Sequence, residues 1–184
     1  MKCLFIKDIG KYKTYSKKNS LVLFFTQQGL WALFVYRIGN AVYRSKLPKF
    51  VKSFLLLFAV LGQKWIEVVA GISLPYSASI GHSFYIGHFG TIIINANAVI
   101  GDNCNISQGV TIGVSGRGEN RGVPVIGNNV YMGANAIIAG KITVGNNAVI
   151  GANSLVVKDV LEGTTVLGVP AQILNTNDSK EYIL

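Results

Sequence analysis

The chain is poor in the residues that build disulfide frameworks and metal sites. It has two cysteines, Cys3 and Cys104, and two histidines, His82 and His88, among 184 residues. Two cysteines cannot make a disulfide framework, and two histidines cannot supply a three-histidine zinc site within one chain. Neither histidine lies in a metal-ligand spacing. We therefore expect no metal, and we expect Cys104, which falls inside a repeat, to be a small buried side chain rather than a nucleophile.

Acidic residues are scarce at the N-terminal end. Residues 1–70 contain twelve lysines and arginines against Asp8 and Glu67, a net charge of +10, whereas the remainder has five basic and six acidic residues, a net charge of −1. Such a segment suits an anionic membrane surface or a polyanionic substrate, or it simply keeps an apolar segment soluble. No nucleic-acid partner is expected, because the aromatic residues of this segment sit within apolar runs.

The N-terminal segment also lacks the layout of a signal peptide, since its lysines continue to Lys18 and no clear cleavage site follows its apolar stretch. Residues 20–46 and 48–70 are predicted to be helices separated by Pro48. Their uninterrupted apolar run is shorter than the roughly 18–20 residues that span a bilayer. We expect these helices to pack on the rest of the chain or at a subunit interface, or alternatively to lie on a membrane. The expected location is cytoplasmic, with peripheral binding to the inner face of the membrane left open.

Glycine is abundant, with 21 residues and no collagen period, which suggests a repeated turn. An aliphatic residue, often followed by glycine, recurs mostly every six residues, giving twelve hexapeptides or four turns of three. This period fits neither a helix nor an ordinary hairpin protein. It predicts a mainly β fold, a left-handed parallel β-helix over residues 80–161, with aliphatic side chains inside and glycine or asparagine at the corners. The repeating positions are Ile80, Ile86, Ile94, Ile100, Ile106, Ile112, Ile126, Met132, Ile138, Val144, Ile150 and Val156.

The six-residue period fails at two places. Ile86 and Ile94 are eight residues apart, and the extra residues fall near His88. We expect His88 on the outer surface near a groove, where an imidazole can act as a general base; a structural role is the alternative. His82 occupies a corner and is expected to be structural. The second gap, fourteen residues after Ile112, contains the polar stretch 115–122. We interpret this stretch as a loop that carries function or, alternatively, as a neutral insertion.

Residues 80–90, 100–113 and 125–134, with Val169-Pro170-Ala171, resemble the serine acetyltransferase-like branch of hexapeptide acyltransferases. The resemblance covers roughly 71–174, between a helical segment 1–70 and a tail 175–184. It implies a homotrimer, acetyl-CoA as donor, and active sites in grooves between subunits. It places His88 on the family's catalytic histidine. By the same resemblance Gly113, Ala134 and Ala152 line the pantetheine channel, and we add Lys158 on electrostatic grounds as a contact to coenzyme phosphates.

The chain departs from that branch where the amino-acid substrate binds. Family members that act on serine have an aspartate before the catalytic histidine and another about fifteen residues earlier, and here these positions hold Gly87 and Ser73. Their Arg-His pair in the long loop aligns with Gly122-Val123, beside Arg121. Discriminating an amino acid needs partners for both of its charges.

We therefore expect the acceptor to be a hydroxyl of a bacterial surface polysaccharide, such as capsule, or of its precursor, because two basic apolar helices before a short hexapeptide domain resemble the O-acetyltransferases of those systems. Ser73, Glu119 and Arg121 are the candidates for the acceptor side. His88 would be oriented by a backbone carbonyl or by Glu119 across the interface. The alternatives are a serine O-acetyltransferase of cysteine biosynthesis and a non-catalytic trimeric module that binds a membrane surface.

Overall fold

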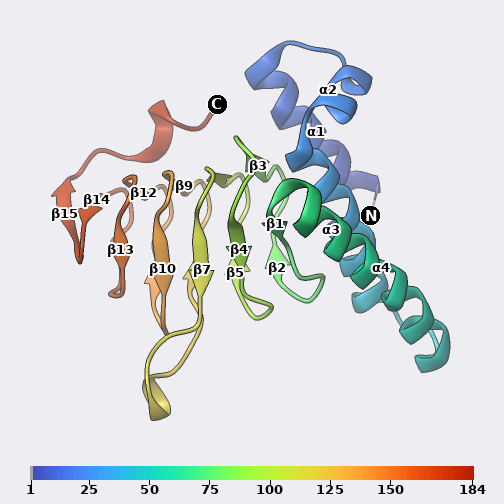
Figure 1. Ribbon diagram of the computed structural model, residues 1–184. Helices are drawn as coiled ribbons and strands as arrows, with labels where there is room; N and C mark the ends of the chain where they lie inside the picture. Colours follow the sequence, from blue (N-terminus) through green and yellow to red (C-terminus); the bar gives the residue numbers. More distant parts are fainter. Residues whose placement is uncertain (1) are drawn as a thin grey trace.

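The computed structural model describes residues 2–184, with side chains from residue 4 onward, so Lys2 and Cys3 lie outside the described side chains. Helices at the N-terminal end are followed by short strands that coil into a β-helix (Figure 1). The helices are α1 (Lys2–Ser16), α2 (Ser20–Thr26), α3 (Gln28–Arg44) and α4 (Lys49–Ala70). The strands are β1 (Ile72–Ser73), β2 (Ser79–Ile80), β3 (Tyr85–Ile86), β4 (Ile92–Ile94), β5 (Val99–Ile100), β6 (Asn105–Ile106), β7 (Thr111–Gly113), β8 (Val125–Ile126), β9 (Tyr131–Met132), β10 (Ile137–Ala139), β11 (Thr143–Val144), β12 (Val149–Ile150), β13 (Leu155–Val156), β14 (Thr165–Gly168) and β15 (Ala171–Asn175). Two 3-10 turns cover Gly118–Asn120 and Ser179–Glu181.

The predicted left-handed parallel β-helix is confirmed. Three sheets form its sides, in the orders β1-β4-β7-β10-β13, β2-β5-β8-β11 and β3-β6-β9-β12-β14-β15. Every pair is parallel except β14 and β15, which are antiparallel. From β1 to β10, each strand therefore pairs with the third strand after it, which is the spacing of a coil with three sides. The repeating aliphatic residues are all buried, with at most 6% of their surface exposed. Stacked aliphatic rows inside the prism supply most of the driving force for folding.

Asparagine occupies the corners, as the sequence predicted. Asn103, Asn129 and Asn147 have φ values of 59°, 54° and 58°, in the left-handed region that asparagine tolerates. Their side chains also bond from coil to coil, because the Asn103 amide donates to Asn129 at 2.9 Å and the Asn129 amide donates to Asn147 at 3.0 Å. One residue type thus provides both the turn and the contact between successive coils.

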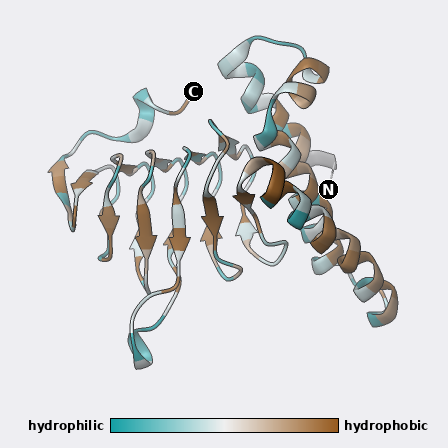
Figure 2. Cartoon of the chain, in the orientation of Figure 1, coloured by the Kyte–Doolittle hydropathy of each residue, from teal (hydrophilic) through white to brown (hydrophobic). Residues whose placement is uncertain are grey.

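The helical segment differs from the prediction in two respects. The predicted helix 20–46 is broken at Gln27 into α2 and α3, which are bent by 95° relative to each other, and α1 was not predicted. The predicted helix 48–70 is confirmed as α4. α4 has 22 residues, and an 18-residue window of it has a mean hydropathy of 1.6, so it is long and apolar enough to cross a membrane, which its interrupted apolar run did not suggest. Figure 2 shows α4 as largely hydrophobic along its length.

Polar side chains attach the helices to the first coil of the β-helix. Arg37 of α3 binds Asp8 of α1 at 2.8 Å, and both side chains are almost completely buried. Arg37 also donates to the carbonyl oxygen of Ile80 at 2.7 Å, and Asp8 accepts from the Phe84 amide at 3.0 Å. Tyr36 donates to the Ala78 carbonyl at 2.8 Å. These bonds hold the helices at the N-terminal end of the β-helix, where Figure 1 shows them.

Candidate functional site

At the first break in the six-residue repeat, between Ile86 and Ile94, the chain passes around the C-terminal end of α4. Gly71 ends that helix with φ of 64°, and the Gly90 amide donates to the Ala70 carbonyl at 2.9 Å. The Gly90 carbonyl accepts from the Gly109 amide of the next coil, also at 2.9 Å. The two additional residues therefore form a corner that is bonded on both sides. His88 stands on this corner with an exposed side chain, as the sequence predicted.

His88 opens onto a groove of about 530 Å³ along the sheet that contains β6, β9, β12 and β14. Ala134 and Ala152, expected to line the coenzyme channel, lie in the same groove. Glycine is required in its floor, because a Cβ on Gly133 would lie 2.7 Å from the Ala152 backbone nitrogen. The small residues keep the groove open next to the imidazole. Its remaining lining residues are Ser107, Gln108, Tyr131, Val149, Gly151, Thr165, Leu167, Leu174 and Tyr182.

Leu174 and Tyr182 were not predicted to be part of this groove. The Tyr182 ring stacks on Tyr131 with centroids 4.6 Å apart. The Tyr182 carbonyl accepts bonds from the Tyr15 hydroxyl at 3.1 Å and from the Asn105 amide at 3.1 Å. No periodicity in the sequence relates Tyr15, Asn105 and Tyr182, so only the folded chain shows that the C-terminal tail lies along the groove.

The other two predicted coenzyme contacts lie elsewhere on the same chain. Gly113 is paired with Ala139 in the sheet of β7 and β10. Lys158 is exposed and lines a separate hollow of about 160 Å³ beyond β13. Within one chain, therefore, His88, Ala134 and Ala152 share a groove that Gly113 and Lys158 do not line.

The second break forms a loop that leaves the β-helix. Its base is closed by paired bonds between Ser115 and Gly122, at 3.1 and 3.0 Å. Both predicted side chains, Glu119 and Arg121, are exposed, and the Glu119 carbonyl accepts from Lys141 at 3.4 Å. The loop connects β7 to β8, and in Figure 1 it projects away from the coils. Among residues 4–184, no carboxylate forms an ion pair with His88.

Ser73 has a carboxylate partner that the sequence did not reveal. Its hydroxyl donates to Glu67 Oε1 at 2.7 Å, and Lys64 and Gln63 bind the same carboxylate at 2.6 and 2.9 Å. Burial acts to raise the pKa of Glu67, but these hydrogen bonds and the Lys64 charge bring that pKa below its usual value. Glu67 is therefore ionised next to position 73. The negative charge near this position is therefore supplied by Glu67 of α4 and not by a residue of β1.

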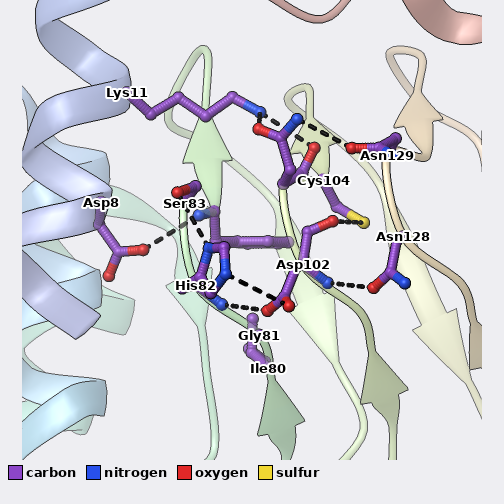
Figure 3. Close-up of polar contacts among 12 residues, drawn as sticks. Asp8, Lys11, Ile80, Gly81, His82, Ser83, Asp102, Cys104, Asn128 and Asn129 are labelled. Carbon is purple, nitrogen blue, oxygen red and sulfur yellow. Dashed lines mark hydrogen bonds and ion pairs between the residues drawn. The ribbon is translucent and has the colours of Figure 1, made fainter. Parts of the chain in front are cut away.

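The second histidine belongs to a corner ladder, shown in Figure 3. His82 donates its backbone N–H to Asp102 Oδ1 at 2.8 Å, and its Nε2 lies 3.3 Å from Asp102 Oδ2. The Asp102 amide donates to Asn128 at 2.7 Å, and the Asn128 amide donates to Asn146 at 2.8 Å. Each corner side chain thus accepts from the backbone of the preceding coil. His82 stands at the first step of this repeated contact.

Cys104 is fully buried beside the same ladder, and burial raises the pKa of its thiol to about 11. A thiol that stays protonated is a poor nucleophile. Among the described residues, no group of three or more histidine, cysteine, aspartate or glutamate side chains could hold a metal ion.

Comparison with known proteins identifies families that this chain resembles. Residues 124–158 match the bacterial transferase hexapeptide (six repeats) family. The chain is 32% identical to the serine acetyltransferase of Bacillus pumilus over 155 residues, which is 84% of this chain and 68% of the relative. It is 36% identical to that of Synechocystis sp. over 163 residues, 89% of this chain and 62% of the relative. The chain spans 61% of the relative from Synechococcus elongatus, which is 32% identical.

Solved structures that resemble this chain are also serine acetyltransferases. The serine acetyltransferase of Brucella abortus superimposes with a TM-score of 0.83 and 26% identity over 97% of this chain and 70% of that protein. A serine acetyltransferase solved in complex with CoA gives a TM-score of 0.79 and 29% identity over 93% of this chain and 68% of that protein. The likeness therefore extends over the N-terminal helices as well as the coils.

The expectation of a polysaccharide acceptor is wrong. It rested on the absence of the aspartates and the Arg-His pair and on the basic helices. The relatives and the solved structures, however, are serine acetyltransferases that share those helices. Changes at a few positions such as Gly87 and Ser73 leave the similarity over the rest of the chain intact. The chain belongs to the serine acetyltransferase family of hexapeptide-repeat acyltransferases.

Proposed function

We propose that the chain transfers the acetyl group of acetyl-CoA to the hydroxyl of L-serine, with His88 as general base. The observation that carries this proposal is the groove in which His88 lies with Ala134 and Ala152. The names of the relatives support serine as acceptor, and a related structure solved with CoA supports the donor. The division into a helical segment 1–70, a catalytic β-helix 71–174 and a tail 175–184 is part of the same proposal, as is a cytoplasmic location.

The chemistry requires one proton acceptor and no second nucleophile. The imidazole of His88 takes the hydroxyl proton of serine while the oxygen attacks the thioester carbonyl. The tetrahedral intermediate then expels the CoA thiolate, which takes the proton from the imidazolium, leaving O-acetylserine and CoA. Direct transfer agrees with the buried, protonated thiol of Cys104.

A homotrimer is part of the proposal. Gly113 and Lys158 lie outside the groove of their own chain. A neighbouring subunit packed against the groove would supply the contacts that one chain does not, with Lys158 near the coenzyme phosphates. The mass of the purified protein, measured by analytical ultracentrifugation, tests this point, because a stable monomer would contradict it.

The experiment that tests the proposed activity is acetyl transfer by the purified chain. Release of the CoA thiol should depend on L-serine, and O-acetylserine should appear in equal amount. Threonine, glycerol and simple sugars serve as alternative acceptors. Turnover that is as fast with another hydroxyl as with L-serine would contradict serine as the substrate. Restored growth of a cysteine auxotroph without serine acetyltransferase would support the same assignment in cells.

A further inference from the structure

The outer face of α4 is a long apolar stripe that the described residues leave largely exposed. Its residues recur every three or four positions, the spacing of one helix face, and each has more than half of its surface exposed. We call this set the α4 stripe: Phe50, Phe54, Leu57, Phe58, Leu61, Trp65 and Val68. An exposed apolar surface of this length on a soluble protein marks a site of contact with another molecule.

The stripe continues across the neighbouring helices. Two apolar hollows, of about 260 and 320 Å³, lie beside it and share Val35 of α3. The first is completed by α4 residues such as Phe58, and the second reaches Phe25 of α2. Leu21 and Phe25 of α2 are also mostly exposed. The apolar surface therefore covers parts of α2, α3 and α4, as the brown colouring of these helices in Figure 2 indicates.

The charges around this surface are mainly positive. Lys49 and Lys64 are exposed on α4, and Lys52 lies at its edge over the Tyr43 ring. The only two carboxylates between residues 4 and 70 are both engaged, Asp8 with Arg37 and Glu67 with Lys64. Exposed basic residues also lie at or just after the ends of α1 and α3: Lys17, Lys18, Arg44 and Lys46.

We propose that the α4 stripe docks the protein in the plane of an anionic lipid bilayer. A helix with phenylalanine, leucine and tryptophan along one face and lysines beside that face has the composition of an interfacial membrane helix. Anionic headgroups complement the lysines, whereas a second copy of the same face would bring like charges together. The stripe enters the boundary between headgroups and acyl chains, and the lysines stay at the headgroups.

The geometry favours docking on the surface over crossing the bilayer. The C-terminal end of α4 is bonded to the β-helix through Ala70 and Gly71, which accept from Gly90 and Ile92 at 2.9 Å each. A crossing helix would also place Lys52, Lys64 and Glu67 in hydrocarbon, which is costly. The catalytic groove, on a different part of the chain, stays outside the bilayer.

Vesicle flotation of the full chain tests this proposal. The vesicles are phosphatidylcholine alone or phosphatidylcholine mixed with phosphatidylglycerol. The chain should float with the anionic vesicles at low salt and much less at about 1 M salt. The double variant Phe54→Ser/Leu61→Ser should reduce the floating fraction by about tenfold or more. Leu161→Ser is the matched control, because Leu161 is an equally exposed leucine on the β-helix.

Four results would overturn the proposal. The first three are no flotation of the natural chain with anionic vesicles at low salt, equal flotation of the double variant, and an equal loss with Leu161→Ser. The mass of the double variant without lipid gives a fourth. A smaller assembly than that of the natural chain would assign the stripe to a second copy. Acetyl transfer to serine in solution should be unchanged in the double variant, so failure here is distinct from failure of the proposed activity.

Discussion

His82 Nε2 lies 3.3 Å from Asp102 Oδ2, so the histidine that has a carboxylate partner is not the one that opens onto the groove. A histidine–carboxylate pair is a common catalytic arrangement, yet here it is one step of a corner ladder. The contact that continues this ladder is made by the His82 backbone amide, which any side chain at this position would retain.

His82→Asn is therefore expected to keep acetyl transfer within about twofold of the natural chain, with a loss of stability of about 1 kcal/mol at most, as for a partly exposed ion pair. Steady-state rates with L-serine and urea unfolding would measure the two effects. A loss of activity by a factor of 100 or so, the scale of a general base, would show that this pair takes part in catalysis.

The Asp8–Arg37 ion pair provides a second prediction, which concerns the stability of the fold. Both side chains are buried, and they join α1 and α3 to the first coil. Asp8→Ala should lower the free energy of unfolding by about 3–5 kcal/mol, because it leaves a buried guanidinium without a counter-charge. The double variant Asp8→Leu/Arg37→Met should lose less than the sum of the two single changes. Additive losses in urea unfolding would show that the two side chains do not act as a pair.

The buried Lys11 side chain predicts an unusual pH dependence of the free energy of unfolding. Its ammonium is buried and donates to Asn103 Oδ1 at 2.6 Å, and burial lowers its pKa from 10.5 to about 8. Between these values the unfolded chain binds more protons than the folded chain, so stability rises with pH. The free energy of unfolding should increase by up to about 2 kcal/mol between pH of about 8 and 10.

Lys11→Met should abolish that rise, and denaturation at the two pH values would show it. Above pH of about 10 the sign reverses, because burial raises the pKa of Tyr12, so that deprotonation then favours the unfolded chain. Equal pH slopes for Lys11→Met and the natural chain would contradict this account.

Gly87 offers a test of acceptor binding. A Cβ at this position would lie 3.4 Å from Tyr85 Cε1, an ordinary contact, so a side chain fits. Gly87→Asp places a carboxylate next to His88, where it can bind the ammonium of serine. The KM for L-serine should fall about tenfold, with Gly87→Asn, which has the same size and no charge, as the control. An equal effect of both variants would rule out the charge as the cause.

The coils could be predicted from the sequence because each buried aliphatic residue, such as Ile100 or Ile126, recurs with the period of the structure. α1 could not, because the residues it buries include Asp8 and Lys11, so no apolar stripe marks it. The break at Gln27 carries no proline, and the contacts of α2 with the neighbouring helices, between the Phe5 and Phe24 rings and between the Trp31 indole and the Phe24 carbonyl, are tertiary.

The site was predictable where it follows the repeat and not where distant segments meet. His88 was found because the period fails there, and Ala134 and Ala152 lie with it. The tail residue Tyr182 joins the groove only through tertiary contacts. The absent aspartates and Arg-His pair led to the wrong acceptor, because they are only a few substitutions in a chain that is otherwise similar to serine acetyltransferases.

The central claim is that His88 is the base. The most direct test is the rate of acetyl transfer from acetyl-CoA to L-serine by His88→Asn, measured beside His82→Asn and the natural chain. The account predicts that His88→Asn is slower by about 100 to 10,000-fold while its fold is retained. Full turnover by His88→Asn would contradict it.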